Sequence, residues 1–332
     1  MMAVLRSGRD AFMEEVHRKI TEPVLDPVLG SHSLVICGCK GGGGKSTLAA
    51  GLGLIYAEMR GELVSALCAN PHMPTLRFRL VPHERKTPRP WIELTYRDGP
   101  GEGVKAQWSQ LAPWVDLVGR LRVVTNDAAD PALTELMQRG HYERIMYLLR
   151  HAGQLVISDM GTSAVGSVAM AALEQANSMA VCCEMDEGSL RSTVNYLALL
   201  RGQRPTDYVE DVDYSKFRGS EHQARLDELG AGAPVVVWPT AKRKRDDPHI
   251  EKRLWWLAEA AGQVVLVPYC EHLAQGGLMS LAKMSRRGTF TVLRPGGKEE
   301  QLPGGTYGAY LHIAASFAER FSYRPSSAEA TA

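Results

Sequence analysis

The feature that most constrains the fold of this chain is a run of glycines between a short apolar segment and a helix-forming segment. Residues 34–37 read Leu-Val-Ile-Cys, and residues 40–47 read Lys-Gly-Gly-Gly-Gly-Lys-Ser-Thr. Consecutive glycines allow backbone N–H groups to turn toward a polyphosphate without clashes from Cβ atoms. A helix that begins directly after them adds free N–H groups and partial positive charge. The sequence therefore predicts a phosphate-binding loop between a buried strand and a helix.

Each polar side chain of this loop has a predicted role at a nucleotide and a magnesium ion. We expect Lys45 to reach the β- and γ-phosphates and the Ser46 hydroxyl to bind Mg²⁺. The Thr47 hydroxyl is expected to hold the α-phosphate. The glycines expected to wrap the phosphates are Gly41, Gly42, Gly43 and Gly44. The predicted cofactors are therefore ATP and Mg²⁺.

The loop follows a variant of the common phosphate-loop pattern. Gly-x4-Gly-Lys-Ser/Thr would require glycine at position 39, where this chain has Cys39. The deviant Walker A form, Lys-Gly-Gly-x-Gly-Lys-Ser/Thr, matches at every position from Lys40 to Ser46. Lys40 is therefore a second candidate functional lysine beside Lys45.

Apolar segments typical of strands alternate with helical segments along the rest of the chain. Helices are expected near residues 45–55, 141–150, 188–200, 249–261 and 306–321. Strands are expected at residues 34–37, 63–67, 121–124, 155–159, 178–183, 234–238 and 264–267, the last being the final strand. This alternation predicts an α/β fold with a doubly wound, mostly parallel sheet and helices on both faces.

The length of 332 residues suits one large α/β domain with insertions. We expect an N-terminal lead-in at 1–30 and the phosphate-loop domain at 31–322. Polar segments rich in turn residues indicate insertions near 82–116 and 202–232. The tail at 323–332 is expected to be disordered.

Composition narrows the expected setting and partners. The formal net charge is +1, so no whole-molecule field draws the chain onto nucleic acid or anionic lipid. No apolar run reaches the roughly 18 residues that a membrane-spanning helix needs. The six cysteines lack the spacing of a disulfide framework, and the N-terminus lacks the apolar core of a signal peptide. We therefore expect a cytoplasmic protein without a transmembrane segment.

Together these motifs resemble the MinD/ParA group of P-loop ATPases, which belong to the SIMIBI class. Lys40 matches the signature lysine of that group, which reaches across an ATP-bound homodimer to the phosphates of the partner. Residues 155–161 (Leu-Val-Ile-Ser-Asp-Met-Gly) match its Walker B strand and the switch after it. The resemblance implies that Asp159 holds magnesium through a water and that Gly161 senses the γ-phosphate. It also implies an ATP-dependent homodimer.

A narrower resemblance is to the EspI-like, MinD-like ATPases of actinobacterial type VII secretion loci. It lies in residues 68–71 and 75–76 (Cys-Ala-Asn-Pro and Thr-Leu) and in residues 159–162 (Asp-Met-Gly-Thr). Residues 268–273 (Pro-Tyr-Cys-Glu-His-Leu) with glycines at 276–277 complete it. This resemblance implies a protein partner in a secretion or positioning system.

The chain departs from the family pattern where hydrolysis is controlled. The strand after the first helix is expected to end in an acid, and here it ends in Cys68, followed by Asn70 in place of a second acid. An asparagine can orient a water but cannot accept its proton, so Asn70 is a candidate catalytic residue with impaired chemistry. An ATP switch with slow hydrolysis, a catalytically impaired pseudo-ATPase scaffold and a chain that no longer binds nucleotide all stay open.

Base recognition and DNA binding are the remaining questions. Relatives use an asparagine after the strand at 235–237, where this chain has Trp238, whose ring is a candidate for stacking on a purine. Pro268 and Tyr269 are the other candidates for contact with the base. The basic run at 242–245 (Lys-Arg-Lys-Arg) keeps a DNA-binding partition ATPase open, beside the simpler interpretation as a solvated loop.

Overall fold

The computed structural model describes most of the predicted domain. The described residues are 18, 21–25, 30–70, 75–82, 90–97, 111–126, 136–162, 167–200, 234–238, 247–319 and 321. Most of the lead-in, the whole of the 202–232 insertion, the basic run at 242–245 and the tail at 323–332 lie outside these residues. The predictions made for those segments therefore stay predictions.

Seven parallel strands form the centre of the sheet, and all seven were predicted. Their neighbours in space run β8-β7-β6-β1-β5-β2-β4, with β1 at the middle. They are β1 (His32–Cys37), β2 (Val64–Ala69), β4 (Leu121–Val124), β5 (Leu155–Met160), β6 (Ser178–Glu184), β7 (Val235–Trp238) and β8 (Val264–Leu266). Nearly every residue of these strands is buried because helices cover both faces. The predicted fold class is confirmed.

Three antiparallel strands extend the sheet at its two edges, giving ten strands among the described residues. β3 (Val115–Val118) pairs with β4, and the hairpin of β9 (Thr289–Arg294) and β10 (Lys298–Pro303) pairs with β8. The prediction that residues 264–267 form the final strand is therefore wrong. The reason is that β10 reads Lys-Glu-Glu-Gln-Leu-Pro, a solvated edge strand without an apolar face.

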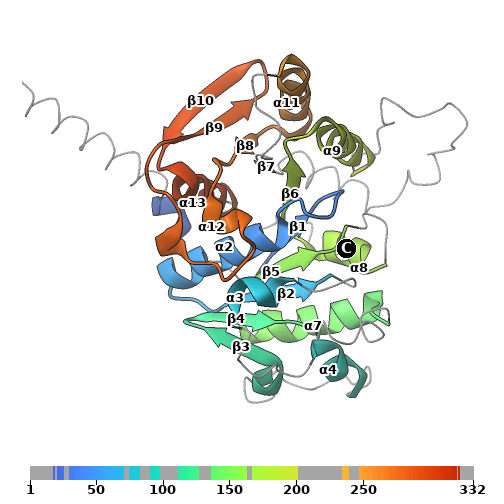
Figure 1. The fold of residues 1–332 in the computed structure, drawn as a ribbon. Helices are drawn as coiled ribbons and strands as arrows, with labels where there is room; N and C mark the ends of the chain where they lie inside the picture. The colour runs from blue at the N-terminus through green and yellow to red at the C-terminus, as the bar shows by residue number, and fades with distance from the viewer. Residues whose placement is uncertain are drawn as a thin grey trace, which may run out of the picture.

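Helices cover both faces of the sheet, as predicted (Figure 1). One face carries α2 (Lys45–Met59), α3 (Leu76–Leu80) and α13 (Gly305–Ala318). The other carries α7 (Arg139–Ala152), α8 (Ser167–Gln175), α9 (Glu187–Leu200) and α11 (Pro248–Ala261), with α4 (Trp91–Arg97) beside α7. Short α12 (Glu271–Ala274) follows β8. The sequence predicted α2, α7, α9, α11 and α13 but did not predict α3, α4, α8 or α12. None of the helices that the structure describes is long and apolar enough to span a bilayer.

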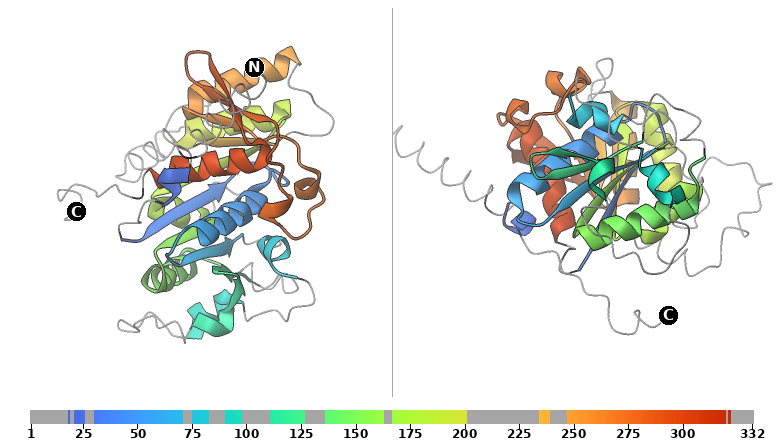
Figure 2. Two further views of the ribbon diagram at one scale, coloured as in Figure 1. Left: turned by 90° about the vertical axis from the view of Figure 1, so that its left-hand side faces the viewer. Right: turned by 90° about the horizontal axis from the view of Figure 1, so that it is seen from below.

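The first helix of the sheet domain is fixed by a close approach to α13, which lies beside it (Figure 2). A Cβ atom on Gly51 would lie 2.2 Å from the Tyr310 ring, so only glycine fits at this crossing. The Tyr310 hydroxyl donates to the backbone carbonyl of Thr47 at 3.3 Å. The start of α2, where the phosphate loop ends, is thereby held by a helix from the far end of the chain.

A largely buried histidine on α13 makes stability depend on pH. Burial, followed by the charge of Arg294, lowers the pKa of His312 from 6.5 to about 4. The unfolded chain therefore binds a proton at pH values where the folded chain does not, so stability falls as pH drops from 6.5 toward 4. The free energy of unfolding of the wild-type protein is expected to fall between pH 7 and pH 5. We expect His312→Gln to make this fall about 2 kcal/mol smaller. Urea unfolding at both pH values checks this; equal losses in both proteins would contradict it.

Candidate functional site

The phosphate loop connects β1 to α2 in a conformation that requires glycine at two positions. Gly42 and Gly44 have φ angles of 83° and 80°, in the left-handed region that glycine adopts without strain. Gly44 is also the N-cap of α2, and a Cβ atom there would lie 2.3 Å from Nε1 of Trp238. The glycine run therefore lets the backbone turn sharply at the helix N-terminus, where unpaired N–H groups suit a phosphate.

Three polar side chains meet at the start of α2. The Ser46 hydroxyl donates to Oδ2 of Asp159 at 2.6 Å, so the structure brings the first turn of α2 to the end of β5. The hydroxyl of Thr75, at the N-cap of α3, lies 2.7 Å from Ser46 Oγ. Sequence reasoning did not assign Thr75 to the site, although the Thr-Leu pair at 75–76 was part of the family resemblance. The result is a group of oxygen atoms at the mouth of the loop.

The Asp159 carboxyl has the properties of a cation ligand. Asp159 is 1% exposed, and its Oδ1 atom has no hydrogen-bond partner among the residues that the structure describes. Burial raises the pKa of Asp159 to about 7, against the opposing effects of the Ser46 hydrogen bond and the Lys45 charge. An unpartnered buried carboxyl oxygen beside a hydroxyl is a donor set that fits Mg²⁺, which prefers oxygen ligands.

The two lysines of the loop occupy different environments. Lys45 is buried, and its ammonium donates to the backbone carbonyl of Lys40 at 2.9 Å. The Lys40 side chain is about half exposed, with its Nζ 3.2 Å from Oε2 of Glu184 and 3.3 Å from Oδ2 of Asp186. Hydrogen bonds to Glu184 and then to Asp186 raise the pKa of Lys40. Lys45 therefore points into the loop, and Lys40 lies on the outer surface near the end of β6.

The end of β2 carries no charge where the family pattern has an acid. Cys68 is fully buried and lies in register with Asp159 on the neighbouring strand. Burial raises the pKa of the Cys68 thiol, with hydrogen bonds from the backbone N–H groups of Asn70 and Leu76 opposing the effect. Cys68 is therefore a neutral thiol, and Asn70 follows it as a partly buried residue at the carboxyl end of β2.

The insertion after α3 supports this strand end. Trp91, the first residue of α4, is fully buried, and its indole N–H donates to the backbone carbonyl of Cys68 at 3.0 Å. The carboxyl end of β2 is thus covered by a tryptophan from the part of the 82–116 insertion that the structure describes.

The candidate base-contact residues lie at the same carboxyl edge of the parallel sheet. Trp238 ends β7 and packs against Gly44 and Tyr310, with 5.9 Å between its ring centroid and that of Tyr310. Pro268 and Tyr269 follow β8, and Tyr269 is 59% exposed. Gly161 follows β5 directly and is buried. The structure therefore brings Trp238 next to the phosphate loop. It leaves the Tyr269 side chain exposed, so that this ring can contact a ligand or another protein.

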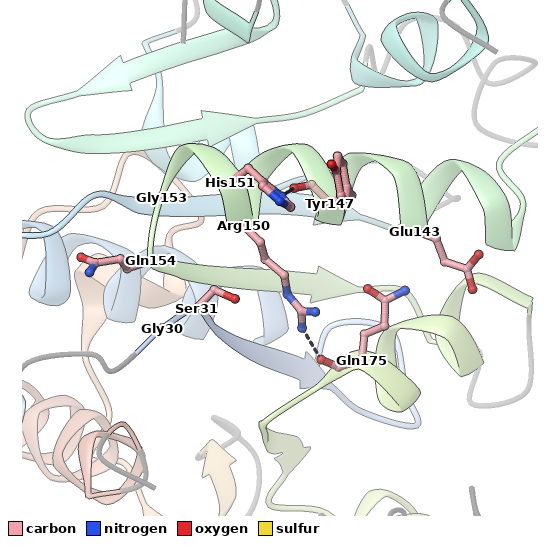
Figure 3. A pocket seen from close by; sticks show the side chains of 9 residues that line it. All are labelled: Gly30, Ser31, Glu143, Tyr147, Arg150, His151, Gly153, Gln154 and Gln175. Atoms are coloured by element: carbon pink, nitrogen blue, oxygen red, sulfur yellow. Dashed lines mark hydrogen bonds between the residues drawn. The ribbon is translucent and has the colours of Figure 1, made fainter. Parts of the chain in front are cut away.

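A cavity of about 630 Å³ lies at the opposite edge of the sheet (Figure 3). It is lined by residues before β1 and β5, including Ser31 and Gln154, and by the last turns of α7. Arg150 donates to the carbonyl of Gln175, and His151 Nδ1 lies 2.7 Å from the carbonyl of Tyr147. Because ligands of open α/β sheets bind at the carboxyl ends of the strands, this cavity does not compete with the phosphate loop.

Comparison with solved structures defines the class of fold. MinD from Pyrococcus horikoshii OT3, complexed with Mg-ADP, has a TM-score of 0.56 at 15% identity, over 86% of this chain and 94% of that chain. MinD from Pyrococcus furiosus has a TM-score of 0.55 at 12% identity, over 87% of this chain and 99% of that one. A ParA family ATPase from Chlorobium tepidum TLS has a TM-score of 0.54 at 14% identity, over 75% and 90%. The chain therefore has the fold of the MinD and ParA P-loop ATPases.

Sequence comparison adds no closer relative. No protein-family model and no curated protein sequence matches the chain. At identities of 12–15% the structural likeness establishes the fold alone. Function must therefore be argued from the side chains of the site.

Proposed function

We propose that the protein binds ATP with Mg²⁺ at the loop 40–47 and acts as a nucleotide-dependent switch. The observation that carries this proposal is the group at the start of α2: buried Lys45, and Ser46 hydrogen-bonded to Asp159, whose second oxygen has no partner within the described part of the chain. Burying a carboxyl group and a lysine that form no ion pair with each other costs free energy of folding, which a purely structural role does not explain. A phosphate and a cation would satisfy both.

The residues of the loop divide the binding between them. Backbone N–H groups of the glycines at 41–44 hold the phosphates at the N-terminus of α2, and Lys45 turns from the Lys40 carbonyl toward them. Ser46 and Asp159 would hold Mg²⁺, and Gly161, two residues after Asp159, would contact the terminal phosphate. Bound magnesium supplies positive charge that balances the phosphate oxygens. Trp238, Pro268 and Tyr269 remain the proposed contacts of the base.

Hydrolysis is expected to be slow. Phosphoryl transfer depends on positioning a water and on stabilising charge, and the end of β2 offers a neutral buried thiol at Cys68. Asn70 can orient a water but cannot take its proton. A switch with slow turnover and a pseudo-ATPase scaffold share the same binding site, and a measured rate of phosphate release separates them.

The nucleotide-bound form is proposed to be a homodimer with a further protein partner. Lys40 is exposed on the loop surface, where it can reach a second copy of the chain, once it leaves Glu184 and Asp186. Among proteins of this fold, MinD from Aquifex aeolicus has been solved as a MinC:MinD complex. We propose a comparable partner from a secretion or positioning system, on the surface near Asn70 and Gly161.

Replacing Lys40 with alanine tests the dimer. We expect Lys40→Ala to bind MgATP and yet to stay monomeric, because the phosphates of each copy lose the ammonium of the other. Analytical ultracentrifugation with and without MgATP checks this, with the exposed Lys283→Ala as the matched control. Equal ATP-dependent dimerisation of all three proteins would contradict a role for Lys40 between copies.

A further inference from the structure

The hydroxyl of Thr75 lies beside Ser46 and Asp159, the residues proposed to hold magnesium, and it is hydrogen-bonded to Ser46. Ser46 Oγ has a single proton, which it donates to Oδ2 of Asp159 at 2.6 Å. When the Asp159 carboxylate accepts that proton, the 2.7 Å contact between Ser46 Oγ and Thr75 Oγ1 uses the proton of Thr75. Thr75 donates, Ser46 relays and Asp159 accepts, so the three groups form one oriented chain of hydrogen bonds.

Thr75 lies in the segment between β2 and α3, at the start of which the resembled family carries an acid and this chain does not. The segment between β2 and α3 begins after the buried, neutral Cys68 and ends with Thr75 at the N-cap of α3. Thr75 makes no side-chain hydrogen bond that caps this helix. Its hydroxyl is therefore directed to Ser46, not to the backbone of its own helix, which is unusual for a threonine at an N-cap.

The position of Thr75 is fixed by the helix that follows it. Arg77 forms an ion pair with Asp116 of β3 at 3.1 Å, and both side chains are buried. Arg79 donates to the backbone carbonyl of Leu273 in α12 at 3.1 Å. Since α3 is held at two further points, Thr75 is presented to the site by a rigid element, which favours precise placement of a polar group.

We propose that Thr75 is a positioning residue for the bound magnesium and, through it, for ATP. This inference rests on the proposed function. Mg²⁺ in nucleotide sites usually keeps several waters, which need hydrogen-bond partners from the protein. Thr75 and Asp159 provide those partners on either side of Ser46, and the threonine hydroxyl supplies the oxygen that Cys68 cannot.

Removing the hydroxyl separates this role from a structural one. We expect Thr75→Val, which keeps the shape of the side chain, to weaken MgATP binding about tenfold, as outer-shell partners of a metal commonly do. Binding of ATP in the presence of EDTA is expected to be unchanged, and Thr75→Ser is expected to restore the wild-type affinity for MgATP. Isothermal titration calorimetry of the full chain measures all of these, and Thr75→Ala replaces the valine variant if that protein does not fold.

The possible outcomes distinguish the proposed role of Thr75 from the proposed binding of ATP. Wild-type affinity for MgATP in the valine variant would overturn the role of Thr75. An equal loss with and without magnesium would also overturn it, because a damaged loop, not the metal, would then explain the change. Failure of the wild-type chain to bind ATP at all would overturn the proposed function itself, and this inference with it.

Discussion

Replacing Lys45 with alanine is expected to weaken the binding of MgATP at least about 30-fold. Lys45 is the buried cation of the loop, and its ammonium lies 2.9 Å from the carbonyl of Lys40, within the turn that the phosphates would enter. Truncating one partner of a buried, hydrogen-bonded charge pair costs about 2–5 kcal/mol. That corresponds to a loss of affinity of about 30-fold to several thousand-fold. Calorimetric titration with MgATP measures it.

Two controls make the Lys45 result specific. Lys283→Ala removes an exposed lysine on the same chain and is expected to leave ATP binding unchanged. Thermal unfolding of Lys45→Ala shows whether the loop and α2 remain folded without the ammonium. A folded Lys45→Ala variant that binds MgATP as tightly as wild type would place the phosphates somewhere other than this loop.

Replacing Asp116 with leucine is expected to destabilise the fold by about 3–5 kcal/mol, the cost of leaving one charge of a buried pair uncompensated. Arg77 and Asp116 are 8% and 6% exposed, and 3.1 Å separates Nε of the guanidinium from the carboxylate oxygen. The pair joins α3 to the antiparallel edge strand β3. Urea unfolding monitored by circular dichroism gives the change in free energy.

The double variant Arg77→Met, Asp116→Leu is the matched control for this pair. Removing both charges leaves no buried ion behind, so we expect it to be clearly more stable than Asp116→Leu alone. A double variant that loses at least as much stability as the single one would show that packing around Arg77, and not its charge, holds α3. The same comparison tests whether the element that carries Thr75 depends on this anchor.

The sequence predicted the central sheet because its strands carry a local signal. Buried parallel strands contain short, continuous apolar runs, and residues 155–157 and 179–183 show this pattern clearly. The edge strands lack it. β10 is mostly charged, and its pairing with β9 depends on a turn in which Gly296 and Gly297 take φ angles of 73° and 71°. That turn signal was present in the sequence, and β9 alternates through Thr-Phe-Thr-Val, but the charged residues of β10 showed no matching apolar pattern.

The phosphate loop was predicted for the same reason, since its glycines, lysine and serine are contiguous. Thr75 was missed as a site residue because it lies 29 positions from Ser46, and only the packing of α3 against α2 brings the two hydroxyls together. Lys40 was predicted as functional, but its ion pairs to Glu184 and Asp186, about 146 positions away, follow from β6 lying beside β1. Contacts of this kind depend on topology, which a single sequence specifies only in outline.

Calorimetric titration of the wild-type chain with ATP, in magnesium and again in EDTA, tests the central claim most directly. The arrangement of Lys45, Ser46 and Asp159 predicts saturable binding of ATP that becomes weaker when magnesium is chelated. A chain that binds no ATP in either condition would contradict the proposed switch, and its buried carboxyl and lysine would then be features of the fold alone.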